Sequence, residues 1–147
     1  MVIQLYGRQE LTGGMMTMAI IFYLPGFEER GETLLRRTMD ALPRREIEAI
    51  RVFTDLRRRL LRPLSNLRVA VLFCMTKADL QDIFSLEGLL LDMKIILILP
   101  DDDAETLVKA HHLRPRYLSW LDDDFMDIGV VLQKMIELYD VPLDEDG

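Results

Sequence analysis

Two short stretches of the chain are apolar at every position, and they limit the possible folds more than any other feature. Residues 69–73 read VAVLF and residues 95–99 read IILIL. A strand with one face in water alternates apolar and polar residues, whereas a continuous aliphatic run is typical of a strand covered by helices on both faces. The two stretches therefore predict a parallel sheet buried between two helical layers.

Similar runs recur along the chain and alternate with helical patterns. The predicted strands are Met18–Leu24, Ile47–Phe53, Leu67–Cys74, Lys94–Leu99 and Arg116–Trp120. Between and after them, apolar residues recur every three or four positions, in helices that end before Pro43, Pro63, Pro115 and Pro142. The remaining helix carries Leu80, Ile83, Phe84 and Leu91 and is loosened by Gly88. Five strand–helix units predict an α/β fold, a doubly wound three-layer sandwich with a five-stranded parallel sheet in the order 2-1-3-4-5.

The 147 residues suit one domain. We expect this domain to span residues 18–140, with an acidic tail at 141–147 that includes Asp144, Glu145 and Asp146. Residues 1–17 are an N-terminal extension for which three origins stay open: an extra strand with its loop, an upstream start, or vector-derived sequence.

Charge and composition argue against several classes of protein. The net charge of −7 disfavours wrapping of nucleic acid and docking on an anionic membrane. The apolar run from Met15 to Leu24 is far shorter than the ~20 residues that span a bilayer. One cysteine, Cys74, excludes an internal disulfide framework and fits a small core residue. We therefore expect a cytoplasmic protein.

The charge is unevenly distributed along the chain. Residues 28–78 hold twelve basic and seven acidic residues, a net charge of +5, whereas residues 79–147 hold five basic and seventeen acidic residues, a net charge of −12. Two interpretations stay open: complementary surfaces used in self-association, or helix caps with a solvated tail.

The order of elements and the segment Lys94–Leu121 resemble the receiver domains of response regulators. The resemblance covers roughly residues 18–140. The fifth strand of receivers reads aromatic, aliphatic, any residue, lysine, proline, and the matching positions here are Tyr117 to Leu121. The resemblance implies that Tyr117 takes the place of the family's aromatic switch residue and Trp120 that of its lysine.

The reactive residues of receivers are missing. The family phosphorylates an aspartate at the end of the third strand, but residues 67–77 contain no acid. An acidic pair after the first strand holds Mg²⁺ in the family; here Leu24, Pro25 and Gly26 follow that strand. Phosphoryl transfer needs the carboxylate, the metal and a cationic clamp together. The sequence therefore predicts a degenerate pseudo-receiver that cannot be phosphorylated, is not an enzyme and needs no cofactor.

Such a module would act in signal transduction, or as a scaffold, through protein contacts. The contact surface of the family is made by its fourth helix, fifth strand and fifth helix. This implies a partner face with Lys109, His112, Tyr117, Trp120 and parts of Asp127–Tyr139. We expect self-association as a homodimer, or a protein partner, at that face. For Trp120, packing in the core is the alternative to anchoring a partner.

The rival interpretation is a metal-binding protein or a metal-dependent enzyme. Two aspartate triplets follow the last two predicted strands, and Asp101, Asp102, Asp122 and Asp123 could supply oxygen ligands to Mg²⁺ or Ca²⁺. The competing explanation is helix capping, by Asp102 with Glu105 and by Asp124 with Asp127.

A run of arginines lies on the second predicted helix. Leu56, Leu60 and Leu61 form the buried stripe of that helix, which places Arg57–Arg59 and Arg62 in water. The patch is either a solvated face or a docking site for an acidic partner.

Overall fold

The structure is a computed structural model, and it describes residues 19–42, 46–62 and 67–139. The predicted extension at 1–17 and the acidic tail at 141–147 lie outside the described residues. The strands are β1 Ala19–Tyr23, β2 Glu46–Ile50, β3 Leu67–Phe73, β4 Lys94–Leu99 and β5 Tyr117–Trp120. The helices are α1 Glu29–Ala41, α2 Phe53–Leu60, α3 Lys77–Phe84, the 3₁₀ turn η2 Glu87–Leu89, α4 Ala104–His112 and α5 Met126–Tyr139.

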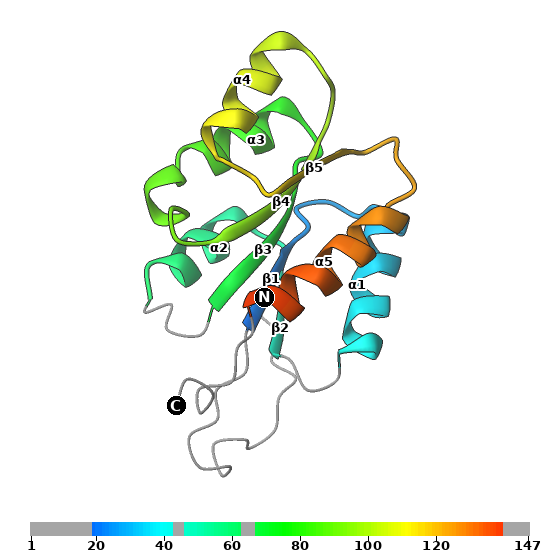
Figure 1. Cartoon of the computed structure of the whole chain (residues 1–147). Helices are drawn as coiled ribbons and strands as arrows, with labels where there is room; N and C mark the ends of the chain where they lie inside the picture. Colours follow the sequence, from blue (N-terminus) through cyan, green and yellow to red (C-terminus); the bar gives the residue numbers. More distant parts are fainter. Residues whose placement is uncertain (1–18, 43–45, 63–66, 140–147) are drawn as a thin grey trace.

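The five strands form one parallel sheet in the order β2-β1-β3-β4-β5. Helices α1 and α5 cover one face of the sheet, and α2, α3 and α4 cover the other (Figure 1). The predicted doubly wound sandwich is confirmed, and its arrangement is flavodoxin-like. All strands run in the same direction, so their carboxyl ends meet at one edge, which lies at the top of Figure 1.

The side chains of each central strand pack into two separate hydrophobic cores, one on each face of the sheet. In β4, Ile95, Leu97 and Leu99 pack toward α2, α3 and α4, while Ile96 and Ile98 pack toward α1 and α5. All five side chains are at most 1% exposed. Because successive side chains of a strand point to opposite faces, only a run that is apolar at every position can bury both. The VAVLF and IILIL stretches are therefore explained by helices on both sides.

Helix α1 approaches the sheet closely at Gly31. A Cβ atom at this position would lie 3.0 Å from Leu24 Cδ2 and 3.2 Å from Phe73 Cε2. The glycine thus brings the first turn of α1 against the carboxyl ends of β1 and β3. No described helix is both long and apolar enough to cross a membrane.

Two predicted boundaries are wrong. The second strand ends at Ile50, and Phe53, which we assigned to the strand, begins α2. The third helix ends at Phe84 instead of continuing to Leu91, which is 72% exposed. Here the backbone changes to bonds between residues three apart, such as Leu86 N–H to Ile83 O, and these tighten the chain into η2.

The arginine run does not lie wholly in water. Arg59 is only 8% exposed, whereas Leu61, predicted to be buried, is 57% exposed. The reason is Glu48 of β2, whose side chain is fully buried and lies on the sheet face covered by α2. Arg59 Nε donates to Glu48 Oε1 at 2.6 Å, and a second nitrogen donates to Oε2 at 3.1 Å. A buried carboxylate needs such a partner, so the helix turns this arginine inward.

Candidate functional site

The carboxyl end of β3 holds no reactive group. Phe73 and Cys74 are both 0% exposed. The Phe73 ring packs edge to face on Phe125, with ring centroids 5.5 Å apart and an interplanar angle of 79°. Burial raises the pKa of the Cys74 thiol, which keeps it protonated and unreactive. The expectation that Cys74 is a core residue is confirmed.

A carboxylate does approach this end of the strand, but it caps a helix. Asp79 Oδ2 accepts hydrogen bonds from the backbone N–H groups of Met75, at 2.9 Å, and Thr76, at 3.2 Å. Thr76 Oγ1 in turn accepts from the N–H of Asp79 at 3.1 Å. This capping box fixes the start of α3 and uses the carboxylate for structure.

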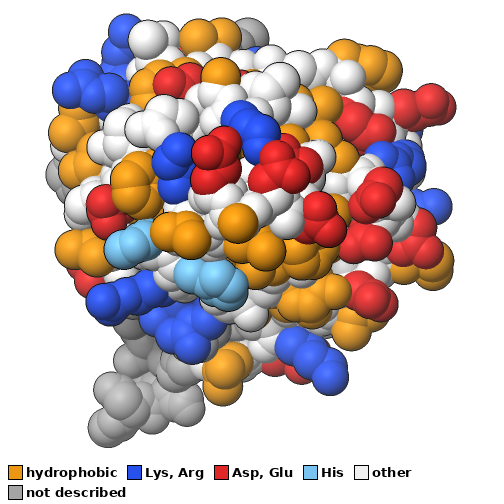
Figure 2. Space-filling view, turned by 90° about the horizontal axis from the view of Figure 1, so that it is seen from above, with side chains coloured by type: hydrophobic (Ala, Val, Ile, Leu, Met, Phe, Trp, Pro, Cys, Tyr) orange, Lys and Arg blue, Asp and Glu red, His pale blue; other side chains and the backbone are white. Residues whose placement is uncertain are grey.

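After β4, the acidic residues surround a lysine of the chain itself. Lys77 Nζ, at the start of α3, forms ion pairs with Asp103, with Asp101 at 3.2 Å and with Glu105 at 3.6 Å. The hydrogen bond to Asp103 is the main reason that the pKa of Lys77 is raised. Figure 2 looks onto this edge of the sheet and shows acidic and basic side chains intermingled there. We call these four residues the Lys77 cluster; in it one ammonium group pairs with three carboxylates and offsets part of their charge.

The predicted capping box of α4 is wrong. The N-cap is Asp103 rather than Asp102, and its side chain forms no capping hydrogen bond. Asp101 Oδ1 instead accepts from the backbone N–H of Asp103 at 3.0 Å. Glu105 is drawn toward Lys77, which removes it from the reciprocal bond that a capping box needs.

The cluster predicts a pH dependence of stability. The pKa of Asp101 is lowered by the nearby Thr106 hydroxyl, then by the Asp103 N–H and by Lys77. The buried Thr106 oxygen has no hydrogen-bond partner among the described residues. A carboxylate with a lowered pKa stabilises the fold above its unfolded pKa, and that stability is lost as the pH falls through the lowered value.

We therefore expect the Asp101→Asn variant to lose less stability than the unmodified chain when the pH is lowered. The amide keeps an acceptor for the Asp103 N–H but cannot titrate. The melting temperature of the variant should fall less between pH 5 and pH 2 than that of the unmodified chain, measured by circular dichroism. Parallel curves for the two proteins would contradict this role of Asp101. Asp92→Asn, at an exposed position outside the cluster, is the matched control.

The second aspartate triplet, after β5, also serves local structure. Asp123 Oδ2 accepts from Ser119 Oγ at 2.8 Å, and Asp124 Oδ1 accepts from the N–H of Met126 at 3.0 Å, at the start of α5. Asp124 thus bonds a backbone N–H at the start of α5, but Phe125 is the residue before the helix, and among the described contacts none forms the predicted capping box of Asp124 with Asp127. Across the described residues, no three His, Cys, Asp or Glu side chains are placed to hold a metal ion. The geometry thus gives no support to the rival metal site at Asp101, Asp102, Asp122 and Asp123.

The loop between β5 and α5 is held by a residue that sequence reasoning missed. The Arg30 guanidinium, from α1, donates to the backbone carbonyls of Leu121 and Asp123. It also lies over the Phe125 ring, 4.7 Å from the centroid. Phe125 has a φ of 65°, an uncommon conformation for a residue with a Cβ, and it is buried against Phe73. These contacts give the acidic loop a defined shape.

The four predicted partner-face residues fall in two places. His112 of α4 packs edge to face on Phe84 of α3, with centroids 6.0 Å apart. Lys109 lies on the same helical stripe as Glu105 and His112, both of which contact α3. Tyr117 instead packs on the α5 side of the sheet, in contact with the other core.

Trp120 is half-buried on the α4 side of the sheet. Its Nε1–H donates to the carbonyl of Asp101 at 3.0 Å, which joins the end of β5 to the loop after β4. This contact agrees with the core-packing alternative, and a role of Trp120 in partner binding stays a prediction.

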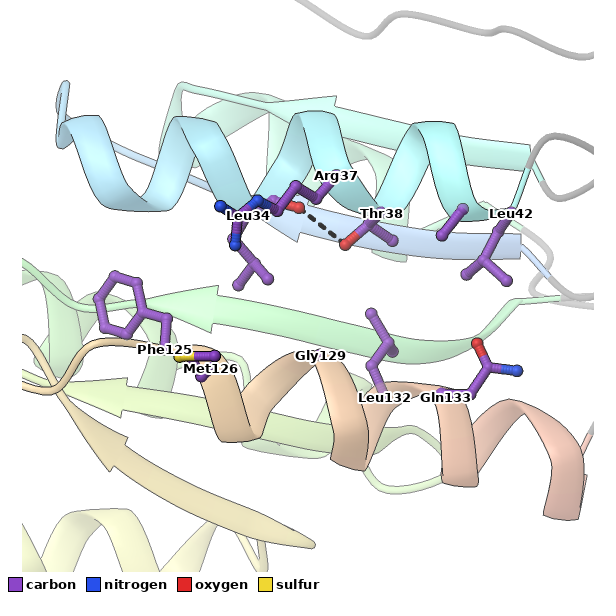
Figure 3. Close-up of a pocket in the computed structure, with 10 residues that line it drawn as sticks. Leu34, Arg37, Thr38, Leu42, Phe125, Met126, Gly129, Leu132 and Gln133 are labelled. Carbon is purple, nitrogen blue, oxygen red and sulfur yellow. Dashed lines mark hydrogen bonds between the residues drawn. The ribbon is translucent and has the colours of Figure 1, made fainter.

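Helix α5 exposes apolar side chains. Met126, Val130 and Leu138 are 67%, 56% and 65% exposed. Toward α1, the helix borders an apolar groove of about 200 Å³ (Figure 3). In that view Leu34 and Thr38 of α1 face Phe125 and Leu132 across the groove, and the Thr38 hydroxyl is bonded to the carbonyl of Leu34.

Toward β5, the surface beside α5 is polar instead. A groove of about 430 Å³ is lined by Tyr117, Ser119, Asp122, Asp123, Asp124, Phe125, Asp127 and Ile128. We call this the acidic groove. The pKa of Tyr117 is raised by burial and by the carboxylates of Asp127 and Asp123, so the phenol stays neutral. The groove can therefore offer negative charge together with an aromatic contact.

Comparison with known proteins supports the fold. No family model matches the chain, and no curated protein matches its sequence. A solved structure from Burkholderia pseudomallei, of a protein whose description relates it to pilus assembly, matches with a TM-score of 0.59 and 17% sequence identity. The match covers 82% of this chain and 90% of the other. At this identity the similarity concerns the fold.

Proposed function

We propose that the chain is a receiver-like module that has lost phosphoryl transfer and acts as a signalling or scaffold component through protein contacts. The observation that carries the proposal is the fully buried, apolar end of β3, where Phe73 and Cys74 occupy the region of the receiver phosphoacceptor. At the other positions where the resemblance to receivers puts reactive groups, the chain carries apolar side chains as well. Leu24 is buried after β1, Leu99 is buried at the end of β4, and Trp120 occupies the lysine position.

A receiver-like module that does not transfer phosphoryl groups would act by binding other proteins through its surface. On α5, Asp127, Val131, Lys134 and Leu138 are spaced three or four residues apart and share one stripe, and Asp127 lines the acidic groove beside Tyr117. Leu138 on this stripe is largely exposed. Exposed aliphatic and aromatic groups next to charged residues are typical of protein contact surfaces. This supports a partner face formed by β5 and α5, with self-association as the simplest form.

The structural neighbour suggests a setting for such a module. Its description relates it to pilus assembly. We propose that this chain serves as a non-catalytic scaffold in a protein assembly of that general kind.

Sedimentation of the purified chain tests the proposal. We expect concentration-dependent self-association that is the same with and without acetyl phosphate and Mg²⁺. Leu138→Glu places a charge in the contact surface and should weaken association by about tenfold or more. Leu91→Glu changes an equally exposed leucine in the loop before β4 and should leave association unchanged.

Two results would contradict the proposal. One is association that requires the phosphodonor, since it would reveal an active phosphoacceptor. The other is a chain that is monomeric at every concentration and also binds no protein through the surface that Leu138→Glu alters.

A further inference from the structure

The outward face of α2 is basic, and no described element packs on it. Leu61 is 57% exposed, and Arg57 and Arg62 lie beside it without a carboxylate partner among the described residues. Of the other two arginines, Arg58 pairs with Asp55 at 3.3 Å and Arg59 is buried on Glu48. Within the described parts of the chain, the face therefore offers two guanidinium groups without an ion pair, next to an aliphatic side chain. A protein surface that covers it must be acidic and carry some apolar area.

The acidic groove has that chemistry. Four of its lining residues are aspartates with exposed side chains: Asp122, Asp123, Asp124 and Asp127. Tyr117 and the neighbouring Met126, which is 67% exposed, add apolar area. The cation that the described contacts bring to this loop is Arg30; its two terminal nitrogens donate to backbone carbonyls, and its Nε pairs with Glu28. The aspartates therefore keep most of their charge for a partner.

The two surfaces cannot meet within one molecule. Helix α2 packs on β2, and the acidic groove lies beside β5; these strands are the opposite edges of the sheet (Figure 1). Between molecules, the basic surface of one copy can meet the acidic surface of the next. Such a contact is heterologous, and it leaves a free basic face at one end and a free acidic groove at the other.

We propose that copies of this chain associate head to tail, with the α2 face of one copy docked in the acidic groove of the next. This inference rests on the proposed function and specifies the partner as a second copy. It assigns the uneven charge of the sequence to complementary surfaces. Because the contact is largely electrostatic and lies at the surface, salt should screen it.

Charge reversal in two separate variants tests the contact. Arg57→Glu/Arg62→Glu makes both surfaces acidic. Asp122→Lys/Asp127→Lys cancels the net charge of the four groove aspartates and sets two lysines against the arginines of the next copy. Each variant alone should lose association by about a hundredfold or more, because like charges then face each other. An equimolar mixture should associate again, since every contact in it joins opposite charges. Arg36→Glu, at an exposed position of α1, is the control and should associate like the unmodified chain.

The outcomes separate this inference from the proposed function. Association that weakens with salt, grows beyond a dimer and returns in the mixture supports the head-to-tail contact. A closed dimer, or reversal variants that associate normally, overturns it while leaving a non-catalytic protein-binding module in place. Circular dichroism melting of each variant shows whether it is folded. If a reversal variant is unfolded, the neutral variants Arg57→Gln/Arg62→Gln and Asp122→Asn/Asp127→Asn replace it. Their association should be weaker than that of the unmodified chain, and unchanged association would overturn the inference.

Discussion

Glu48→Ala is expected to lower the free energy of unfolding by about 3–5 kcal/mol, the range for breaking a buried ion pair from one side. Glu48 is fully buried and holds Arg59 through two hydrogen bonds. Removal of the carboxylate leaves the guanidinium of Arg59 in the core without a partner. Urea denaturation followed by far-ultraviolet circular dichroism measures the loss.

Two comparisons show whether the unpaired charge is the cause. Glu29→Ala removes an exposed glutamate and should change stability by no more than about 0.5 kcal/mol. Glu48→Leu combined with Arg59→Met replaces both partners by apolar groups of similar size and should recover most of the loss. A double variant as unstable as Glu48→Ala would show that packing, not charge, sets the effect.

Phe73→Ala is expected to be of similar severity, costing about 3–5 kcal/mol as for other buried aromatic residues. The ring is fully buried, packs on Phe125 and lies against the first turn of α1 at Gly31. Its removal opens a cavity under the β5–α5 loop, so it should also loosen the acidic groove. Chemical denaturation gives the cost in stability.

The same truncation at an exposed site is the control for Phe73. Phe27 is 79% exposed, and Phe27→Ala should leave stability within about 0.5 kcal/mol. If Phe73→Ala were equally mild, the end of β3 could collapse around the missing ring, and the idea that this ring shapes the loop would be wrong.

The fold was predictable because its signals are local. The apolar runs of β3 and β4 and the prolines after the helices are visible within a few residues. The end of β2 was not predictable in this way. Phe53 continues the apolar pattern of the strand, although the backbone has already begun α2. Leu91 was misassigned for a related reason, since its spacing continues a helical pattern that the chain leaves at Phe84.

The side-chain arrangements of the candidate site were less predictable because they join distant segments. The side chain of Arg59 points into the core because it pairs with the buried carboxylate of Glu48, eleven residues earlier on β2. Lys77 pairs with Asp101 and Asp103 because β3 and β4 are neighbours, and this adjacency follows from the predicted strand order. Tyr117 and Trp120 are three residues apart on one strand, and the period of two therefore places them on opposite faces.

The inward carboxylate of β2 also bears on how the chain pairs its strands. Sliding β2 by one residue along β1 would turn Glu48 into the layer of α1 and α5, away from Arg59. A foreign strand added at this edge would face the same inward charge. Edge strands with an inward-pointing charge resist irregular pairing. Glu48 thus favours the native register of β2, because a one-residue slip would separate its carboxylate from Arg59.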